Sequence, residues 1–298
     1  MKKIILKCSI VFILVLIGII AVIPSNKSYE NTPWMKDLQD DFKIVDLSIP
    51  GTHNSGSPYN FFEFLGKCQE LTVENQLKIG VRFFDIRLQN RNDELYIVHD
   101  MMDQKQKFEK MVELVNKYME ENPSEFLIIS IKQDADPINK TKSFEELTMS
   151  ALNSLNNLNT SNSLPNTLGE ARGNVYILNR FTSTEFGIPA FNNWKDSTSF
   201  MLDSLYVQDN YSVKTVEEKI NDIKEAFKFQ EENDIVTINF ASCYLKDLVF
   251  PYHYALTPAL DINDWLNDYV QTLDSTGILL VDFATEELVE NIYMRNFK

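Results

Sequence analysis

Histidine is the residue type whose positions point most directly to chemistry in this chain. The sequence contains three histidines, and two of them, His53 and His99, follow or end segments that we predict to be strands. Proline and glycine in Ile49-Pro-Gly-Thr52, directly before His53, predict a sharp loop that displays the ring. Because imidazole gains and loses a proton near neutral pH, we expect His53 and His99 to serve as a base and an acid.

Charged side chains close the other predicted strands. They are Asp85, Arg87, Lys132, Arg180, Asp209 and Asp282. In a (β/α)8 barrel the carboxyl ends of the strands converge on one face, where the active site is built. Two histidines, two arginines, a lysine and three acids in one such mouth suit an anionic substrate.

Cleavage of a phosphodiester is the reaction that this set fits best. It needs a base for the attacking hydroxyl, an acid for the leaving oxygen and positive charge for the phosphoryl oxygens. His53, His99 and Arg87 supply all three, since a guanidinium donates two parallel hydrogen bonds to phosphate. No three or four carboxylates or histidines have the spacing of metal ligands, and Arg87 would repel a divalent cation near Asp85. We therefore expect no metal and no cofactor.

The elements that must position these residues alternate along the chain. Apolar runs predict eight strands, most of them separated by segments with the three- and four-residue periodicity of helices. The strands are predicted over 43–48, 81–87, 94–99, 126–131, 173–180, 205–209, 235–240 and 277–282. A clear helix begins at Phe108 and is stopped by Asn122-Pro123, and Thr215-Val-Glu-Glu218 predicts the capping box of another.

This alternation is compatible with a parallel barrel or with a doubly wound open sheet. The charged strand ends favour the barrel, because the first and last strands of an open sheet lie too far apart to share a site. A helix is missing between 81–87 and 94–99, and the strand 205–209 is short. We therefore predict an α/β fold consisting of a single irregular (β/α)8 TIM-type barrel that need not close completely.

Composition and the N-terminus indicate where the protein works. The formal net charge of -15 excludes nucleic-acid binding, which needs a basic face. Met1-Lys2-Lys3 and the apolar run from Cys8 to Pro24 have the pattern of a signal peptide or of an N-terminal membrane anchor. We predict a leader over 1–30, cleaved export being favoured over a retained anchor, and one catalytic barrel over 31–298. The barrel is expected to be a monomer, either secreted or anchored at the outer face of the cytoplasmic membrane.

Two cysteines, Cys68 and Cys243, remain after the leader. One disulfide and two free buried thiols are equally compatible with the sequence. Neither cysteine has a histidine at the spacing of a nucleophile or of a zinc site, so we assign them no chemistry.

Eight short runs, in order and with compatible spacing, resemble bacterial phosphatidylinositol-specific phospholipase C, the X-domain family. They are Ile49-Pro-Gly-Thr-His53, Phe84-Asp-Ile-Arg87, Val98-His99, Ser130-Ile-Lys132, Leu178-Asn-Arg180, Val207-Gln-Asp-Asn-Tyr211, Thr237-Ile-Asn-Phe240 and Val281-Asp-Phe283. The resemblance covers the chain from about Trp34 to the end. It implies a metal-independent lyase on an irregular (β/α)8 barrel. Such an enzyme converts phosphatidylinositol into diacylglycerol and inositol 1,2-cyclic phosphate, and hydrolyses the cyclic ester slowly.

The resemblance also implies a role for each matching residue. His53 would take the proton of the inositol 2-hydroxyl, with Asp282 holding its other ring nitrogen. Arg87 would stabilise the phosphate, and His99 would protonate the diacylglycerol oxygen with Asp85 as its support. The residues that would bind the inositol are Lys132, Arg180 and Asp209, through its hydroxyls, and Tyr211, by stacking on the ring.

Asn54 departs from the family pattern, which usually has aspartate directly after the base histidine. That aspartate is thought to pair with the catalytic arginine, so an amide predicts slower turnover. Histidine followed by asparagine also occurs in the calcium-dependent eukaryotic phospholipases C, and a calcium-dependent phosphodiesterase of the same barrel class is therefore an alternative. Arg87 stands where those enzymes carry an acidic ligand, which favours metal independence.

Aromatic segments give the chain a second candidate surface. Related enzymes dip apolar residues near the barrel mouth into the bilayer, and Phe61, Phe62, Phe64 and Phe250 suit that use. Packing in the core is an equally good interpretation of these residues. His253, in the same run as Phe250, we interpret as an aromatic-loop residue without a chemical role. The expected partner is phosphatidylinositol in membranes, and proteins with glycosylated inositol anchors are further candidates.

Two other functions remain open. A glycerophosphodiester phosphodiesterase would share the barrel, but it needs a metal cluster of glutamates that the sequence does not offer. A catalytically silent, membrane-tethered binder of inositol lipids or glycans would not require an oriented base. Retention of both histidines and of Asp282 speaks against such a binder.

Overall fold

The computed structural model describes residues 27–59, 66–247 and 256–298. The chain divides into two units, residues 1–30 and 31–298. Of the first unit, residues 27–30 are described and they form neither helix nor strand. Most of the expected leader, and Phe61, Phe62, Phe64, Phe250 and His253, lie outside the described residues. Within the described part, no helix combines the length and apolar character that crossing a bilayer requires.

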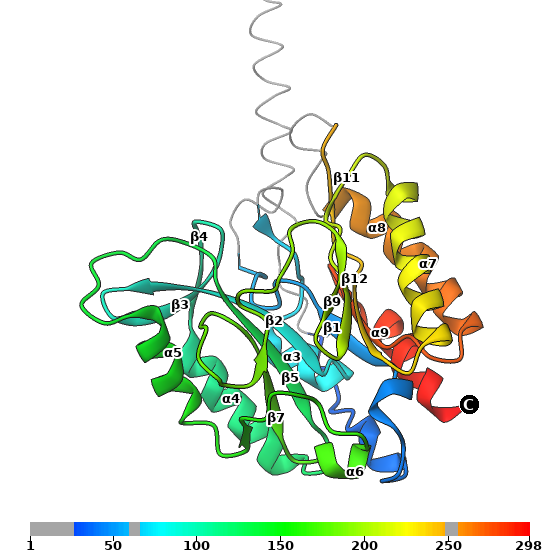
Figure 1. Ribbon diagram of the computed structural model, residues 1–298, viewed down its shortest axis with the longest axis horizontal. Helices are drawn as coiled ribbons and strands as arrows, with labels where there is room; N and C mark the ends of the chain where they lie inside the picture. The colour runs from blue at the N-terminus through cyan, green and yellow to red at the C-terminus, as the bar shows by residue number, and fades with distance from the viewer. Residues whose placement is uncertain (1–26, 60–65, 248–255) are drawn as a thin grey trace, which may run out of the picture. The chain divides into compact units, whose positions relative to one another are not determined.

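Seven parallel strands form the frame of the second unit. Their order across the sheet is β7-β5-β2-β1-β14-β12-β10. Their bounds are Val175–Arg180, Leu127–Gln133, Phe83–Arg91, Ile49–Thr52, Ile278–Val281, Val236–Phe240 and Leu205–Gln208. The first and last of them in the chain, β1 and β14, are neighbours, with Thr52 beside Val281. This adjacency confirms the barrel-like arrangement over a doubly wound open sheet, and Figure 1 shows the sheet curling around β1 and β2.

The barrel is incompletely closed in the described part of the chain, because no pairing joins β7 to β10 there. Short strands border the two ends of the sheet instead. They are β6 (Leu158–Asn159) and β8 (Ile188–Pro189) beside β7, and β9 (Ser199–Leu202) antiparallel to β10. Two further short strands, β11 (Ser212–Val213) and β13 (Tyr244–Leu245), pair with each other.

The helix missing between the second and third predicted strands is explained by a hairpin. Strand β2 turns at Asn92 and Asp93, whose φ angles of 53° and 62° suit a tight two-residue turn. Strand β3 (Glu94–His99) therefore returns antiparallel to β2, and β4 (Met102–Lys107) pairs with β3. A hairpin needs no crossover helix, whereas a parallel pair does.

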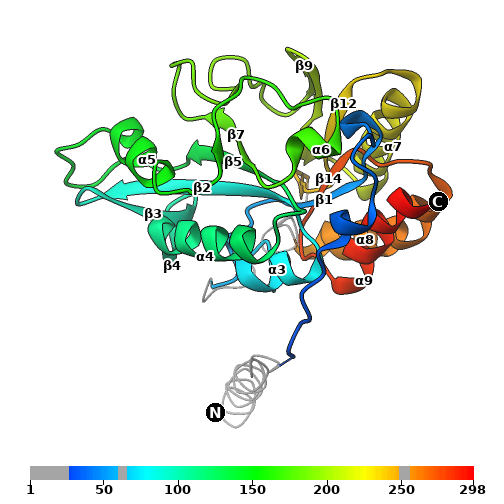
Figure 2. The ribbon, with the colours of Figure 1, turned by 90° about the horizontal axis from the view of Figure 1, so that it is seen from below.

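Helices cover the outside of the curled sheet. They are α3 (Val73–Ile79), α4 (Phe108–Glu121), α5 (Phe144–Leu152), α6 (Leu168–Ala171), α7 (Val216–Glu232), α8 (Leu256–Tyr269) and α9 (Glu286–Tyr293). Four 3-10 turns are also described: η1 (Trp34–Asp37), η2 (Ile44–Asp46), η3 (Val270–Thr272) and η4 (Met294–Phe297). Figures 1 and 2 show α7, α8 and α9 gathered beside β12, β14 and β1, and α4 and α5 beside β2 and β3. As predicted, Thr215 caps α7 by accepting a hydrogen bond from the Glu218 amide at 3.1 Å.

The first predicted strand was placed wrongly. Residues 44–46 form η2, and β1 is instead the segment Ile49–Thr52 that we expected to be a loop. Gly51 is required there for close packing: a Cβ on it would lie 2.9 Å from Leu280 Cγ and 3.0 Å from Phe83 Cβ. The glycine therefore allows β1 to fit between its two neighbours, and the chain turns only after His53.

Candidate active site

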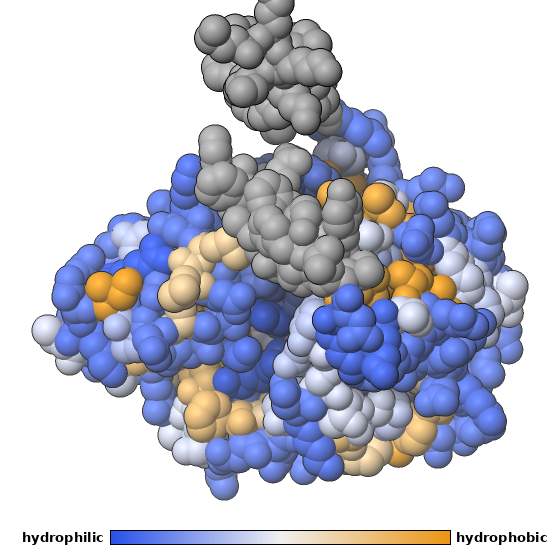
Figure 3. Space-filling model, turned by 90° about the horizontal axis from the view of Figure 1, so that it is seen from above, coloured by the Kyte–Doolittle hydropathy of each residue, from blue (hydrophilic) through white to orange (hydrophobic). Residues whose placement is uncertain are grey.

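A cavity of about 800 Å³ opens at the carboxyl ends of the parallel strands. Eight of the ten predicted catalytic and inositol-binding residues line it: His53, Arg87, His99, Lys132, Arg180, Asp209, Tyr211 and Asp282. The remaining two, Asn54 and Asp85, are buried behind that lining. Hydrophilic side chains predominate around the hollow at the middle of the face shown in Figure 3. The structure thus brings all the predicted catalytic and inositol-binding residues to one place.

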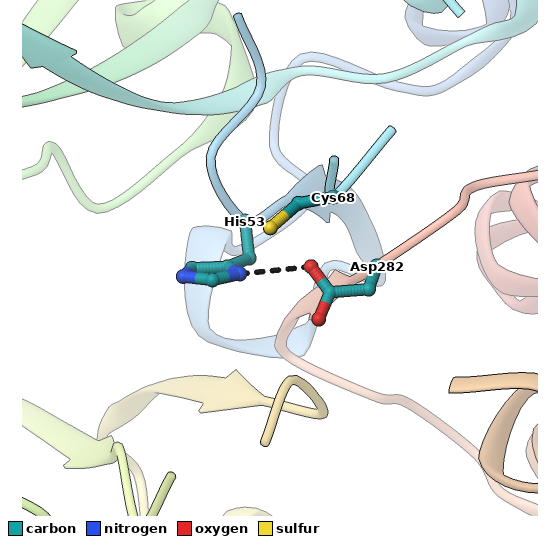
Figure 4. A group of neighbouring side chains, drawn as sticks. All are labelled: His53, Cys68 and Asp282. Atoms are coloured by element: carbon teal, nitrogen blue, oxygen red, sulfur yellow. Dashed lines mark hydrogen bonds and ion pairs between the residues drawn. The ribbon is translucent and has the colours of Figure 1, made fainter. Parts of the chain in front are cut away.

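His53 and Asp282 meet because β1 and β14 are neighbours. Nδ1 of His53 lies 2.8 Å from Oδ1 of Asp282 (Figure 4). Gln69 fixes the two strand ends, since its amide donates to the carbonyl of His53 at 2.8 Å and to that of Val281 at 2.9 Å. An imidazole that donates from Nδ1 to a carboxylate keeps Nε2 as an acceptor. Sequence reasoning missed Gln69, whose place in the sequence carries no signal of this role.

The electrostatic environment of His53 favours its protonated form. Burial by itself lowers the pKa of the ring, but the charge of Asp282 and its hydrogen bond outweigh burial and raise the pKa to about 9. Arg87 opposes this rise, and its Nη2 lies 2.9 Å from His53 Nε2. The ring is therefore held between a carboxylate on one nitrogen and a guanidinium on the other.

Three cations stand side by side on adjacent strands. Arg87 pairs with Lys132 across β2 and β5, and Lys132 pairs with Arg180 across β5 and β7. Such a row is destabilising unless acids separate the charges. Asp134 does so from above the row, with Oδ1 3.0 Å from Lys132 Nζ and 3.6 Å from Arg87 Nη1. Asp134, the first residue after β5, was missed by the sequence analysis, although it stands only two residues from Lys132.

The expectation that Asp85 supports His99 is wrong. The carboxylate of Asp85 lies between the two arginines, 3.3 Å from Arg87 Nε and 3.5 Å from Arg180 Nη1. Burial raises the pKa of Asp85, but these guanidiniums outweigh it and hold the pKa well below its usual range. The carboxylate is fully buried and each of its oxygens faces one arginine, so it serves as their counterion, and no described contact joins it to His99.

His99 reaches the site by a different route from the one we expected. It ends β3, which runs antiparallel to β2, and not a parallel strand of the barrel. The register, with Leu88 opposite Ile97, brings the end of β3 back alongside the part of β2 that carries Arg87. The backbone carbonyl of Gly66 accepts from His99 Nδ1 at 2.8 Å. This contact orients the ring in place of the expected carboxylate.

Asn54 adopts a left-handed backbone conformation with φ of 44°, which asparagine tolerates better than most residues. Its backbone amide donates to Asp85 Oδ2 at 3.3 Å. Its Nδ2 lies 3.4 Å from His53 Nε2 and 3.7 Å from Cys68 Sγ. Among the described residues, its buried Oδ1 has no hydrogen-bond partner and the side chain has no bond to Arg87. The side chain therefore faces the base, where we expected it to face the arginine.

Two of the inositol-binding candidates, Asp209 and Arg180, contact Trp194, which the sequence did not single out. Nε1 of Trp194 donates to Asp209 Oδ2 at 2.9 Å, and the Arg180 guanidinium lies 3.7 Å from the centre of the Trp194 ring. The Tyr211 hydroxyl donates to Asp196, and this hydrogen bond raises the pKa of Tyr211 to about 12. Trp194 thus holds the side chains of Asp209 and Arg180 in fixed positions in the cavity wall.

Lys219 supports this wall from below. It projects from α7 and is fully buried, and its Nζ donates to Gln208 Oε1 at 3.0 Å and to the Asn210 carbonyl at 2.7 Å. Both acceptors flank Asp209. Burial lowers the pKa of Lys219 despite the acids around it. The sequence placed this lysine on a helix and gave no sign that it points inward.

Cys68 and Cys243 are free, buried thiols, which decides between the two alternatives that the sequence left open. Burial raises the pKa of both thiols, that of Cys243 to about 12. Cys68 lies among the site residues, with Sγ 3.8 Å from His99 Nδ1. Spacing along the sequence had indicated no histidine near it, because the contact depends on how the β2–β3 hairpin folds back.

Comparison with known proteins gives a consistent result. Residues 38–180 match the family described as phosphatidylinositol-specific phospholipase C, X domain. A 1-phosphatidylinositol phosphodiesterase of Staphylococcus aureus is 31% identical over 288 residues, covering 87% of this chain and 89% of the relative. One of Listeria monocytogenes is 26% identical over 292 residues, covering 92% and 87%. A solved structure of the S. aureus phospholipase, from work on its membrane binding, superposes with a TM-score of 0.78 at 25% identity and covers 89% of this chain and 98% of that one.

Proposed function

The chain belongs to the family of bacterial phosphatidylinositol-specific phospholipases C, and from this membership we propose what its site does. It is a phosphatidylinositol diacylglycerol-lyase, which cleaves phosphatidylinositol to diacylglycerol and inositol 1,2-cyclic phosphate. One observation carries the proposal most directly. The His53 ring lies between Asp282 and Arg87, and His99 lines the same cavity.

The first half of the reaction is assigned to His53, Asp282 and Arg87. His53 Nε2 accepts the proton of the inositol 2-hydroxyl while that oxygen forms a bond to phosphorus. Asp282 stabilises the imidazolium that results, as its effect on the pKa of His53 indicates. Arg87 stabilises the charge on the phosphoryl oxygens, because a guanidinium matches their geometry with two donors.

The second half is assigned to His99. As the bond between phosphorus and the diacylglycerol oxygen breaks, the imidazolium of His99 gives that oxygen a proton. Its Nδ1 is held by the Gly66 carbonyl, which leaves Nε2 as the donor. Slow hydrolysis of the cyclic ester would use the same groups with their roles exchanged.

The inositol ring is assigned to Lys132, Arg180, Asp209 and Tyr211. Lysine and arginine donate to hydroxyl oxygens, and Asp209 accepts from hydroxyl protons. Tyr211 lines the cavity with its hydroxyl already bonded to Asp196, so its ring face remains as the contact for the sugar.

Metal independence is supported by the way the acids of the site are used. Calcium takes about six to eight oxygen ligands, most of them carboxylates and carbonyls. Both oxygens of Asp85 face guanidiniums, and Asp134 contacts Arg87 and Lys132. A cation would have to displace these fixed positive charges. Arg87 and its neighbours therefore supply the positive charge that a metal provides in the calcium-dependent alternative.

The substrate defines the setting in which the enzyme works. Phosphatidylinositol is a membrane lipid, so the enzyme acts at a membrane surface, from outside the cytoplasm if residues 1–30 direct export. We include proteins with glycosylated inositol anchors as further substrates and a monomer as the active form. Both rest on the family resemblance.

The deciding experiment uses the full chain, phosphatidylinositol vesicles and excess chelator, with inositol 1,2-cyclic phosphate as the measured product. We expect product with the native chain and none with His53→Ala. No product from folded native chain would leave the silent lipid binder as the better interpretation. Product only after addition of calcium would favour the metal-dependent phosphodiesterase.

A further inference from the structure

Cys68 joins two site residues in a group of three potential metal ligands. A ligand atom from each of His53, Cys68 and Asp282 lies within 4.8 Å of the other two. Figure 4 shows the sulfur next to Nδ1 of His53, on the side of the ring that faces Asp282. The proposed reaction uses His53 and Asp282, whereas none of its steps uses the Cys68 thiol.

The donor set is the kind that zinc prefers. Zinc binds thiolate, imidazole and carboxylate together, at about 2.3 Å from sulfur and about 2.0–2.2 Å from nitrogen and oxygen. Bonds of this length place tetrahedral ligand atoms about 3.5 Å apart, so small side-chain rotations bring the three atoms onto one ion. Oxygen-preferring cations such as calcium and magnesium gain little from a thiol and an imidazole.

Charge and access also fit a divalent cation. With the thiol proton displaced, Cys68 and Asp282 carry two negative charges, which match the two positive charges of the ion. All three residues line the cavity, so a hydrated ion can reach them from solvent. Arg87 contacts the far ring nitrogen, Nε2, and is therefore on the opposite side of the imidazole from Asp282.

We propose that His53, Cys68 and Asp282 form an inhibitory site for zinc and similar thiol-binding cations. The metal bonds to Nδ1 of His53, Sγ of Cys68 and a carboxylate oxygen of Asp282, with water in the fourth position. Starting from neutral His53, the thiol releases its proton to solvent and the Nδ1 proton is replaced by one on Nε2. Nε2 then carries a proton, so Arg87 loses its contact with it and it cannot accept the proton of a substrate hydroxyl. The carboxylate of Asp282 no longer supports the base.

Binding is tested first, without any assay of activity. Co²⁺ is added to the full chain in chelator-free buffer, because a tetrahedral cobalt–thiolate bond produces a charge-transfer band in the near ultraviolet. We expect one Co²⁺ per chain, displaced by Zn²⁺. The band should disappear in Cys68→Ser and Cys68→Ala and persist in Cys243→Ser, the matched control at the other described cysteine. A band that survives in folded Cys68→Ser, or the lack of any band in the native chain, overturns the site.

Inhibition is tested second, on hydrolysis of soluble inositol 1,2-cyclic phosphate, which avoids effects of zinc on vesicles. Zn²⁺ should abolish the native rate, and chelator should restore it. The Zn²⁺ concentration that gives half inhibition should be at least about tenfold higher for Cys68→Ser than for the native chain. For Cys243→Ser it should equal the native value. Equal inhibition of both variants contradicts the proposal. This second arm rests on the proposed function, but the cobalt band does not, so failure of the lyase activity and failure of the metal site are distinguishable.

Discussion

Nη2 of Arg87 lies 2.9 Å from Nε2 of His53, so the group assigned to the phosphate contacts the nitrogen assigned to the proton. A guanidinium is never an acceptor, so this contact is a hydrogen bond only while the ring is neutral with its proton on Nδ1, the form that acts as the base. A phosphate that binds Arg87 withdraws the guanidinium from Nε2. Substrate binding and exposure of the base are thus linked through one side chain.

Arg87→Lys should separate the charge of this residue from its geometry. Lysine retains a positive charge but loses the two parallel donors, and its shorter reach leaves His53 Nε2 without this contact. We expect kcat/KM for phosphatidylinositol to fall by about 10²-fold or more. Initial rates on mixed micelles with chelator present measure this. A rate within about threefold of native would mean that charge alone is sufficient.

Asp282→Asn should move the pH profile to lower pH. Asp282 raises the pKa of His53 to about 9, and the neutral ring is the form that accepts a proton. In the native enzyme kcat/KM should therefore rise with pH up to about 9, because deprotonation of His53 sets this rising limb of the profile. Without the carboxylate, burial and Arg87 remain and both lower the pKa, so the limb should lie at lower pH with a reduced plateau. The profile is measured with chelator present, and an unshifted limb with a reduced plateau would contradict this role of Asp282.

Asn54→Asp should accelerate turnover. Aspartate is the residue usual in the family, and it also tolerates the left-handed conformation found at this position. A carboxylate beside the base should favour its protonated form during the reaction and raise kcat by about tenfold. Asn54→Gly, which also accepts the left-handed conformation, is a control without the charge. If the aspartate variant were folded and slower than native, the chain would be adapted to the amide.

Lys219→Met should weaken substrate binding without touching the substrate. The change keeps the apolar stem but leaves the Gln208 side chain and the Asn210 carbonyl without their donor, and each such buried group costs about 1–3 kcal/mol. We expect a lower melting temperature and a KM that rises more than kcat falls, because Asp209 lies between the two acceptors. Lys228→Met, at an exposed position of the same helix α7, is the matched control and should change neither quantity. An unchanged KM in folded Lys219→Met would make the lysine purely structural.

The residues that sequence reasoning identified share a local property. Arg87, Lys132 and Asp282 each directly follow an apolar residue that belongs to a strand, so the sequence itself indicates which end of the sheet they reach. The turn at Asn92-Asp93 carried more information than we used. A two-residue turn implies an antiparallel return, and it would have predicted both the missing helix and the direction in which His99 arrives.

The residues that were missed reach the site by long-range packing. Gln69 fixes strand ends that are more than two hundred positions apart in the chain, and its own surroundings look like an ordinary loop. In the sequence, Lys219 is one of several charged residues on an amphipathic helix. Only the packing of α7 against β10 shows that its side chain points inward. The partner of Asp85 was misjudged for a related reason. Sequence order suggests neighbours along the chain, whereas the row of cations that binds Asp85 comes from pairing between strands.

The pairing of β1 with β14 has a consequence for when the enzyme becomes active. His53 is made early, whereas Asp282, which follows the strand β14, is made 229 residues later. A chain still under synthesis therefore has the base without the carboxylate that supports it, and β1 lacks one of its two neighbours. The supported base therefore forms only after β14 has been made and has paired with β1.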